Sequence, residues 1–166
     1  MKKFITPVLA ISALISLTSL AFDGNVLPRS AQVTFPVPGD GEVIKTLGNP
    51  TRRQLPPRKI KFLVWNLHKG TEDAFSSEFY SLSFDRDIVM NQEVFLDTKM
   101  TDVFSYLPQF YFTTATSFYS GKEKIRTGVA NASGVEPAYT EFIRSETLEP
   151  VVNSPKVTLI NSYPIR

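Results

Sequence analysis

Short apolar runs, bounded by charged residues, form the main pattern of the chain from residue 60 onward. Residues 62–65 and 88–90 are continuous apolar runs. Runs of this length between charges are typical of strands buried on both faces, although periodicity alone does not exclude buried helix. Alternating and aromatic-rich stretches add three more predicted strands. We therefore predict strands over 60–66, 87–92, 111–119, 125–132 and 156–163.

Two helices are predicted between these strands. Thr71 can cap a helix whose Phe75, Phe79 and Leu82 fall on one face at helical spacing. A second helix is predicted over 98–107, ended by Pro108. The order strand, helix, strand, helix, then clustered strands is compatible with a layered α/β fold.

The N-terminus has the plan of a secretory signal peptide. Lys2 and Lys3 precede an uncharged apolar stretch over 4–20, and Ser19 and Ala21 place small residues at the two positions that a signal peptidase reads. The alternative is an uncleaved membrane anchor, but a spanning helix needs about 20 predominantly apolar residues, and this stretch is short and rich in hydroxyls. We assign 1–21 as a signal peptide, which predicts an exported protein, periplasmic or secreted, without stable membrane insertion after cleavage.

Composition separates an arm from a domain. Residues 22–58 hold six of the twelve prolines and several glycines, so we expect a Pro/Gly-rich arm or linker with little regular structure, followed by a domain over 59–166. Without Lys2 and Lys3, 18 − 2 = 16 basic residues face 16 acidic ones. This neutral balance gives no support to general nucleic-acid binding. The absence of cysteine excludes disulfides and thiolate zinc sites.

Polar residues that suit a metal or phosphate site follow the first two apolar runs. Asn66 ends the first, and Gln92 and Glu93 end the second. Layered α/β folds usually place their chemistry at strand tips. Mg²⁺ is held by one or two carboxylates together with water and substrate phosphate, which Glu93 could supply. Asn66 could orient a water or a phosphate oxygen through its amide, or simply close a turn.

These motifs resemble the endonuclease/exonuclease/phosphatase superfamily. Trp65-Asn66 and Gln92-Glu93 are similar to the ends of its first two motif strands, and 127–130 (Thr-Gly-Val-Ala) is similar to a third. The resemblance implies a two-sheet β-sandwich flanked by helices, of the four-layer α/β/β/α type. It also implies hydrolysis of phosphate esters with Mg²⁺ (or Mn²⁺), as a nuclease or phosphodiesterase. Asn66 and Glu93 are carried over as catalytic and metal-binding residues.

The motifs that should follow are missing. The family continues with Asn-x-His, Asp-x-Asn and Ser-Asp-His, whereas the one histidine here, His68, lies inside the first motif. We therefore expect only the N-terminal portion of the domain, with its C-terminal half absent and little or no activity. Two alternatives remain: a non-catalytic remnant or secreted binding module, and a β-rich interaction protein whose motif matches are accidental. The sequence does not choose among DNA, RNA, lipid headgroups and small phosphoesters, nor does it indicate an oligomeric state.

Overall fold

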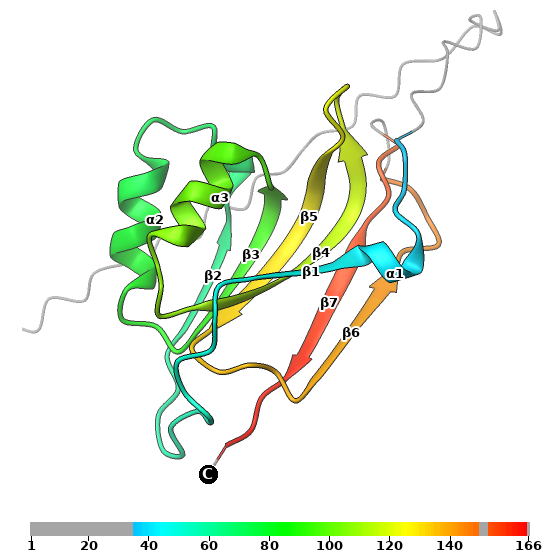
Figure 1. The fold of residues 1–166 in the computed structure, drawn as a ribbon. Helices are drawn as coiled ribbons and strands as arrows, with labels where there is room; N and C mark the ends of the chain where they lie inside the picture. The colour runs from blue at the N-terminus through cyan, green and yellow to red at the C-terminus, as the bar shows by residue number, and fades with distance from the viewer. Residues whose placement is uncertain (1–34, 150–152, 166) are drawn as a thin grey trace, which may run out of the picture. The chain divides into compact units, whose positions relative to one another are not determined.

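The computed structural model describes residues 35–149 and 153–165, which form a mixed α/β fold made mostly of strands (Figure 1). A five-stranded mixed sheet is accompanied by a two-stranded sheet and three short α-helices. The helical elements are α1 (Asp40–Val43), the 3₁₀ helix η1 (His68–Gly70), α2 (Phe75–Ser83) and α3 (Thr98–Ser105). The strands are β1 (Ile44–Leu47), β2 (Phe62–Asn66), β3 (Ile88–Phe95), β4 (Tyr111–Ser120), β5 (Ile125–Ser133), β6 (Tyr139–Arg144) and β7 (Val157–Ser162).

The large sheet has the strand order β1-β4-β5-β3-β2. Only β2 and β3 run parallel, and their register sets Asn66 beside Gln92. The other neighbours are antiparallel, with β4 and β5 forming the hairpin expected from the sequence. A bulge interrupts the pairing of β3 with β5 between Asn91 and Val94. The parallel pair thus brings the first two sequence motifs to the same end of the sheet.

Helices α2 and α3 pack on one face of the large sheet (Figure 1). Phe79 is fully buried and its ring lies 5.9 Å from that of Trp65 and 5.7 Å from that of Phe104. The predicted face of α2 is right for Phe75 and Phe79 but wrong for Leu82, which is 42% exposed. The cap at Thr71 is also wrong, because Thr71 follows η1 and α2 begins only at Phe75.

The opposite face of the large sheet carries β6 and β7 (Figure 1). Val43, Ala115 and Val157 form a small apolar core there, with Leu159 packed against it. A polar contact reinforces this packing, because the Asn131 amide donates to the side chain of Asn161 at 2.8 Å. The second sheet has two strands against five, so it covers only part of this face.

The five predicted strands and both predicted helices are confirmed as elements, with ends displaced by a few residues. The sequence pattern missed α1, β1 and β6. Little regular structure was expected across 22–58, and this is wrong for 40–47, where β1 pairs with β4. A four-residue edge strand among prolines and glycines has too short a pattern to identify, and it is stabilised by its pairing with β4 and by the packing of Ile44 and Leu47.

The predicted signal peptide, 1–21, and the first part of the predicted arm lie outside the described residues. Within the residues that the structure describes, none of the helices has the length and apolar character needed to cross a membrane. Export therefore stays a prediction from the sequence.

Candidate functional site

Asn66 and Glu93 meet at one end of the parallel strand pair. The Asn66 Nδ2 donates a hydrogen bond to Glu93 Oε1 at 2.8 Å, and Asn66 Oδ1 accepts the backbone N–H of His68 at 2.9 Å. These two bonds fix the orientation of the amide, since exchanging its oxygen and nitrogen would lose both. The sequence prediction that the two residues share a site agrees with this contact.

The sequence predicted that the strand ends just before Glu93, and this is wrong. Strand β3 continues to Phe95, and Glu93 stands in the bulge with a φ of 51°. A non-glycine residue in this left-handed region costs of order 1–2 kcal/mol, and such residues cluster at functional sites. A bulge also redirects side chains, and here two consecutive residues, Gln92 and Glu93, are both exposed. The carboxylate is therefore presented by a break in the sheet.

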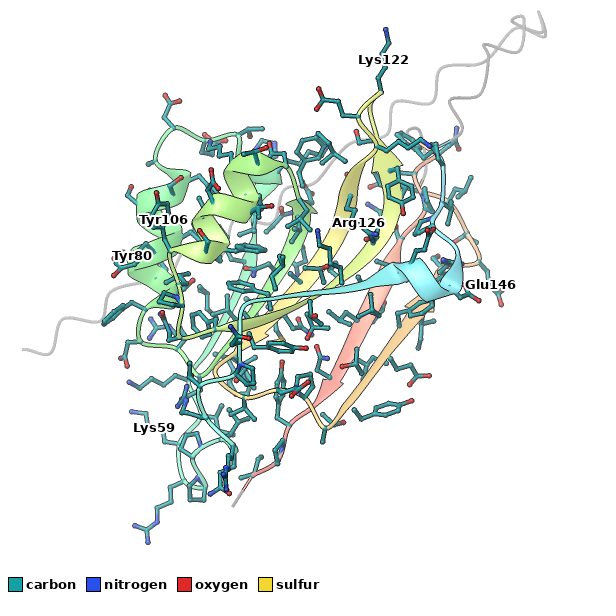
Figure 2. The ribbon with its side chains drawn as sticks, viewed as in Figure 1. Lys59, Tyr80, Tyr106, Lys122, Arg126 and Glu146 are labelled. Carbon is teal, nitrogen blue, oxygen red and sulfur yellow. The ribbon has the colours of Figure 1, made fainter. Side chains whose placement is uncertain are left out.

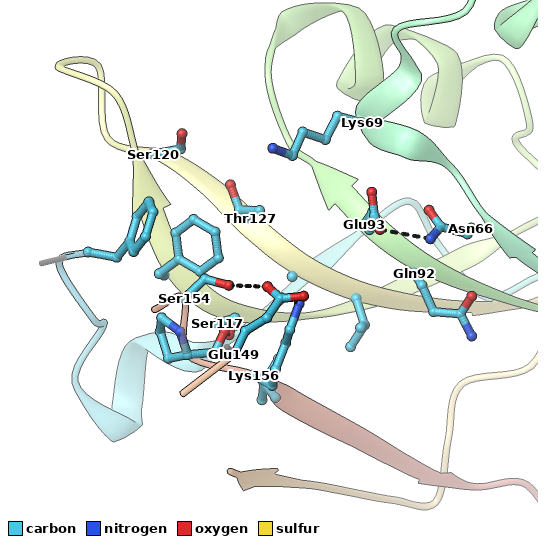
Figure 3. A pocket seen from close by; sticks show the side chains of 16 residues that line it. Asn66, Lys69, Gln92, Glu93, Ser117, Ser120, Thr127, Glu149, Ser154 and Lys156 are labelled. Atoms are coloured by element: carbon cyan, nitrogen blue, oxygen red, sulfur yellow. Dashed lines mark hydrogen bonds and ion pairs between the residues drawn. The ribbon is translucent and has the colours of Figure 1, made fainter. Parts of the chain in front are cut away.

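A pocket of about 500 Å³ opens beside this bulge (Figure 3). Its wall comes from β2, η1, β3, β4, β5, the start of β7 and the segment before it, together with Phe35. The charged and polar side chains lining it are Asn66, Lys69, Gln92, Glu93, Ser117, Ser120, Thr127, Glu149, Ser154 and Lys156. The apolar part of the wall is Phe35, Phe118, Val129, Pro155 and Val157, with Gly128 between the two parts.

A second carboxylate in the pocket, Glu149, is already engaged. Ser154 Oγ donates to Glu149 Oε2 at 2.6 Å, and Lys156 Nζ lies 2.9 Å from the same oxygen. The Ser154 hydrogen bond, followed by the Lys156 contacts, holds the pKa of Glu149 below its ordinary value. Glu149 is therefore a charged, weakly basic wall residue.

Lys69 is the second lysine of the pocket and differs from Lys156. It lies in η1 with a φ of 58°, and its side chain extends into the pocket region in Figure 3. Among the residues that the structure describes, its ammonium has no ion-pair or hydrogen-bond partner. Two other basic residues near the first motif pair with carboxylates outside the pocket: Arg52 pairs with Asp87 at 3.1 Å, and Lys61 pairs with Asp85 at 2.6 Å. Lys61, Asp85 and Asp87 lie just before the starts of β2 and β3.

His68 does not line the pocket. Its ring is exposed, and Nδ1 lies 3.1 Å from Glu72 Oε1 on the surface. Gln92 lines the pocket, but the structure shows no hydrogen bond of its side chain to a described residue, while its carbonyl accepts the N–H of Leu67 at 2.9 Å. Neither residue is placed to move a proton at Glu93.

The donor set at Glu93 fits a hard divalent cation that brings most of its own ligands. Among the described residues, no three carboxylate, imidazole or thiol side chains cluster into a metal site. Glu93 Oε1 accepts from Asn66, and Oε2 of this exposed residue has no hydrogen-bond partner among the described residues. Mg²⁺ is commonly bound through one or two carboxylates with several waters and a substrate phosphate, so a single oriented carboxylate suits it.

Sequence reasoning missed most of the pocket wall. Glu149, Ser154 and Lys156 belong to no motif, whereas Thr127 begins the third motif but was not assigned to the site. The one local signal was Lys69, because it lies three residues after Asn66 and just before a glycine. The others are brought in by the packing of β7 against β4 and β5, which no local pattern encodes.

No known protein family, no curated protein and no solved structure matches this chain. Any function assigned to it therefore depends on its own motifs and on the chemistry of the pocket.

Proposed function

We propose that the pocket is a Mg²⁺- or Mn²⁺-binding site for phosphate esters, in an exported chain of endonuclease/exonuclease/phosphatase type. The observation that carries this proposal is the 2.8 Å hydrogen bond from Asn66 to Glu93 inside the pocket. It joins the two strongest sequence motifs in one site. Lys69, a cation without a partner among the described residues, adds attraction for an anion at the same place.

The arrangement of the elements supports the same family resemblance. Helices cover one face of the large sheet and a second sheet packs on the other, as expected for part of a four-layer α/β/β/α sandwich. The third motif strand lies centrally, because β5 pairs with both β3 and β4. Thr127 at its start lines the pocket, so all three motifs contribute to one wall.

In this proposal each side chain has a separate task. Glu93 holds the cation, and Asn66 fixes the rotamer of Glu93 in the way that outer-shell partners orient metal ligands. Asn66 can also contact the cation or a phosphate oxygen directly, as the motif resemblance implies. Lys69 attracts the phosphate and offsets its charge. The bound cation would polarise the phosphoryl oxygen.

Turnover by this chain should be slow. Hydrolysis needs a base close to the attacking water. His68 lies outside the pocket, and the depressed pKa of Glu149 makes it a poor proton acceptor. This shortage among the described residues favours a second candidate function, a secreted module that binds phosphate esters without cleaving them.

Metal binding is the first test. Mg²⁺ and Mn²⁺ titrations of the full chain, followed by thermal melting and by Mn²⁺ line broadening in NMR spectra, should show saturable binding with broadening centred on Glu93. Glu93→Gln should abolish it, and Asn66→Ala should weaken it about 10- to 100-fold. Glu136→Gln, an exposed carboxylate outside the pocket, is the matched control and should change nothing. Equal binding by Glu93→Gln and the parent chain would rule the site out.

Turnover then separates the two candidates. Bis(4-nitrophenyl) phosphate is offered with Mg²⁺ to the parent chain and to Glu93→Gln. A rate above the Glu93→Gln background identifies a slow phosphoesterase. Metal binding without any such rate identifies a binding module.

A further inference from the structure

The pocket has two chemically different ends. At one end lie Asn66, Lys69 and Glu93. At the other, Phe35 and Phe118 pack with ring centroids 4.6 Å apart at 51°, and both residues are only partly buried. The backbone N–H of Tyr119 donates to the carbonyl of Pro36 at 2.8 Å, which ties Phe35 to the end of β4. An aromatic platform is thus fixed on the wall of a charged pocket.

A polar group that lacks a partner lies between these ends. Thr127 is 5% exposed, and its Oγ1 has no hydrogen-bond partner among the described residues. Buried hydroxyls are normally hydrogen-bonded, so an unpaired one on a pocket wall is a candidate donor to a bound ligand. Figure 3 shows Thr127 between Lys69 and Ser154 on this wall. The Oγ1 atom is itself buried, so an oxygen of a bound phosphate would accept the missing bond once the Thr127 side chain turns its hydroxyl toward the pocket.

Of the two lysines, only Lys69 is free to bind such a phosphate. Lys156 is paired with Glu149, and Ser154 donates its hydroxyl to the same carboxylate. A new anion at Lys156 would have to compete with that pair. Lys69 forms no ion pair or hydrogen bond with a described residue, although its charge acts on Glu149 from a greater distance, and it lines the same pocket as Thr127.

We infer that the pocket selects an aromatic phosphate ester, with the phosphate at Lys69 and Thr127 and the aromatic ring against Phe118 and Phe35. This inference rests on the proposed phosphate-ester function and specifies its substrate class. The volume of about 500 Å³ accommodates a ligand of this size. Stacking on a fixed aromatic side chain favours a ring over an alkyl group.

Binding of simple esters without metal tests the inference. Isothermal titration in EDTA compares phenyl phosphate, ethyl phosphate and inorganic phosphate on the full chain. We expect phenyl phosphate to bind about tenfold more tightly than ethyl phosphate, in line with the worth of stacking on an aromatic side chain. Adenosine monophosphate forms a further arm: tighter binding than phenyl phosphate indicates a nucleobase, and weaker binding indicates a smaller aryl group.

Two variants separate the ends of the pocket. Lys69→Gln should weaken the binding of all three phosphate compounds to a similar degree. Lys122→Gln, at the exposed tip of the β4–β5 hairpin (Figure 2), should leave their binding unchanged. Phe118→Leu should remove the preference for phenyl over ethyl phosphate and leave ethyl phosphate unchanged. Should Phe118→Leu fail to fold, nuclear Overhauser contacts between the phenyl protons and the Phe118 ring in the parent chain replace it.

Equal affinity for phenyl and ethyl phosphate, or no contact with the Phe118 ring, would overturn the inference. These outcomes differ from failure of the proposed function. Loss of metal binding and turnover with an intact phenyl preference refutes the metal site alone. Glu93-dependent metal binding with no phenyl preference refutes the aromatic subsite alone.

Discussion

The two faces of the large sheet differ in how they are held together. Against α2 and α3 lies an aromatic core, in which the rings of Phe104 and Phe112 stack with centroids 4.1 Å apart. The other face has two smaller apolar clusters and a side-chain hydrogen bond, and it leaves Phe62 and Val64 of β2 more than half exposed. The pocket opens on this second face, beside the same strand.

The main apolar core and the pocket therefore lie on opposite sides of one sheet. The helix-covered face buries large rings, which contribute most of the hydrophobic free energy. The pocket face carries the positive-φ Glu93 and the orphaned Thr127 hydroxyl, both of which cost free energy. The core on the helix-covered face offsets these costs, because it does not depend on the pocket residues.

The largest difference in stability should appear when a phenylalanine is replaced by alanine on each face in turn. Phe79→Ala should lower the free energy of unfolding by about 3–5 kcal/mol, because it empties a fully buried site among other rings. Phe62→Ala, at a residue 54% exposed on β2, should cost less than about 1 kcal/mol. Urea denaturation measures both. Similar losses for the two variants would contradict the assignment of stability to the helix face.

A smaller loss of stability should follow from a substitution that pushes apart two neighbouring strands of the sheet. A Cβ at Gly128 would overlap the carbonyl oxygen of Ala115 on β4, so Gly128→Ala must separate the two strands and should cost about 1–3 kcal/mol. Gly41→Ala meets open space and should be nearly neutral. Hydrogen exchange of the β4 and β5 amides localises the change. Unchanged protection in Gly128→Ala would show that the close approach is unimportant.

Two asparagines of the large sheet, one on each face, should respond to substitution in opposite directions. Asn91 pairs with Ala130 in the sheet, is 2% exposed, and has neither amide atom bonded to a described residue. Asn91→Leu should raise the free energy of unfolding by about 1 kcal/mol, because it removes an unpaired polar group. Asn131→Leu should lower it, because it breaks the bond to Asn161. Chemical denaturation of both variants checks the signs, and a loss in Asn91→Leu would indicate that its amide is satisfied.

The smallest expected effect is a pH dependence at the pocket. The pKa of Glu149 is lower in the folded chain than its ordinary value, so this carboxylate stabilises the fold above about pH 4.5 and that contribution is lost as the pH falls through the folded pKa. In Glu149→Gln this part of the acid destabilisation should disappear. Denaturation curves between pH 3 and pH 7 measure it, with Glu136→Gln as the control. An identical pH profile in the parent chain and Glu149→Gln would contradict the Ser154 and Lys156 contacts.

The sequence by itself determined the elements that have strong local patterns. The apolar runs ending at Trp65 and Met90, the aromatic stretch of β4 and the helical spacing of Phe75 and Phe79 each predicted their element. The sequence also singled out Asn66 and Glu93, whereas their hydrogen bond follows from the parallel pairing of β2 with β3 that the structure shows. Local burial and backbone preference suffice for predictions of this kind.

Only the tertiary structure decided how these elements make a pocket. The bulge at Glu93 depends on the register between β3 and β5, and a register is set by contacts between distant strands. Lys156 and Glu149 reach the pocket because β7 packs across β4 and β5. The ring pair of Phe35 and Phe118 joins residues 83 positions apart in the sequence. Such non-local contacts leave no periodic trace in the chain, so composition and spacing could not reveal them.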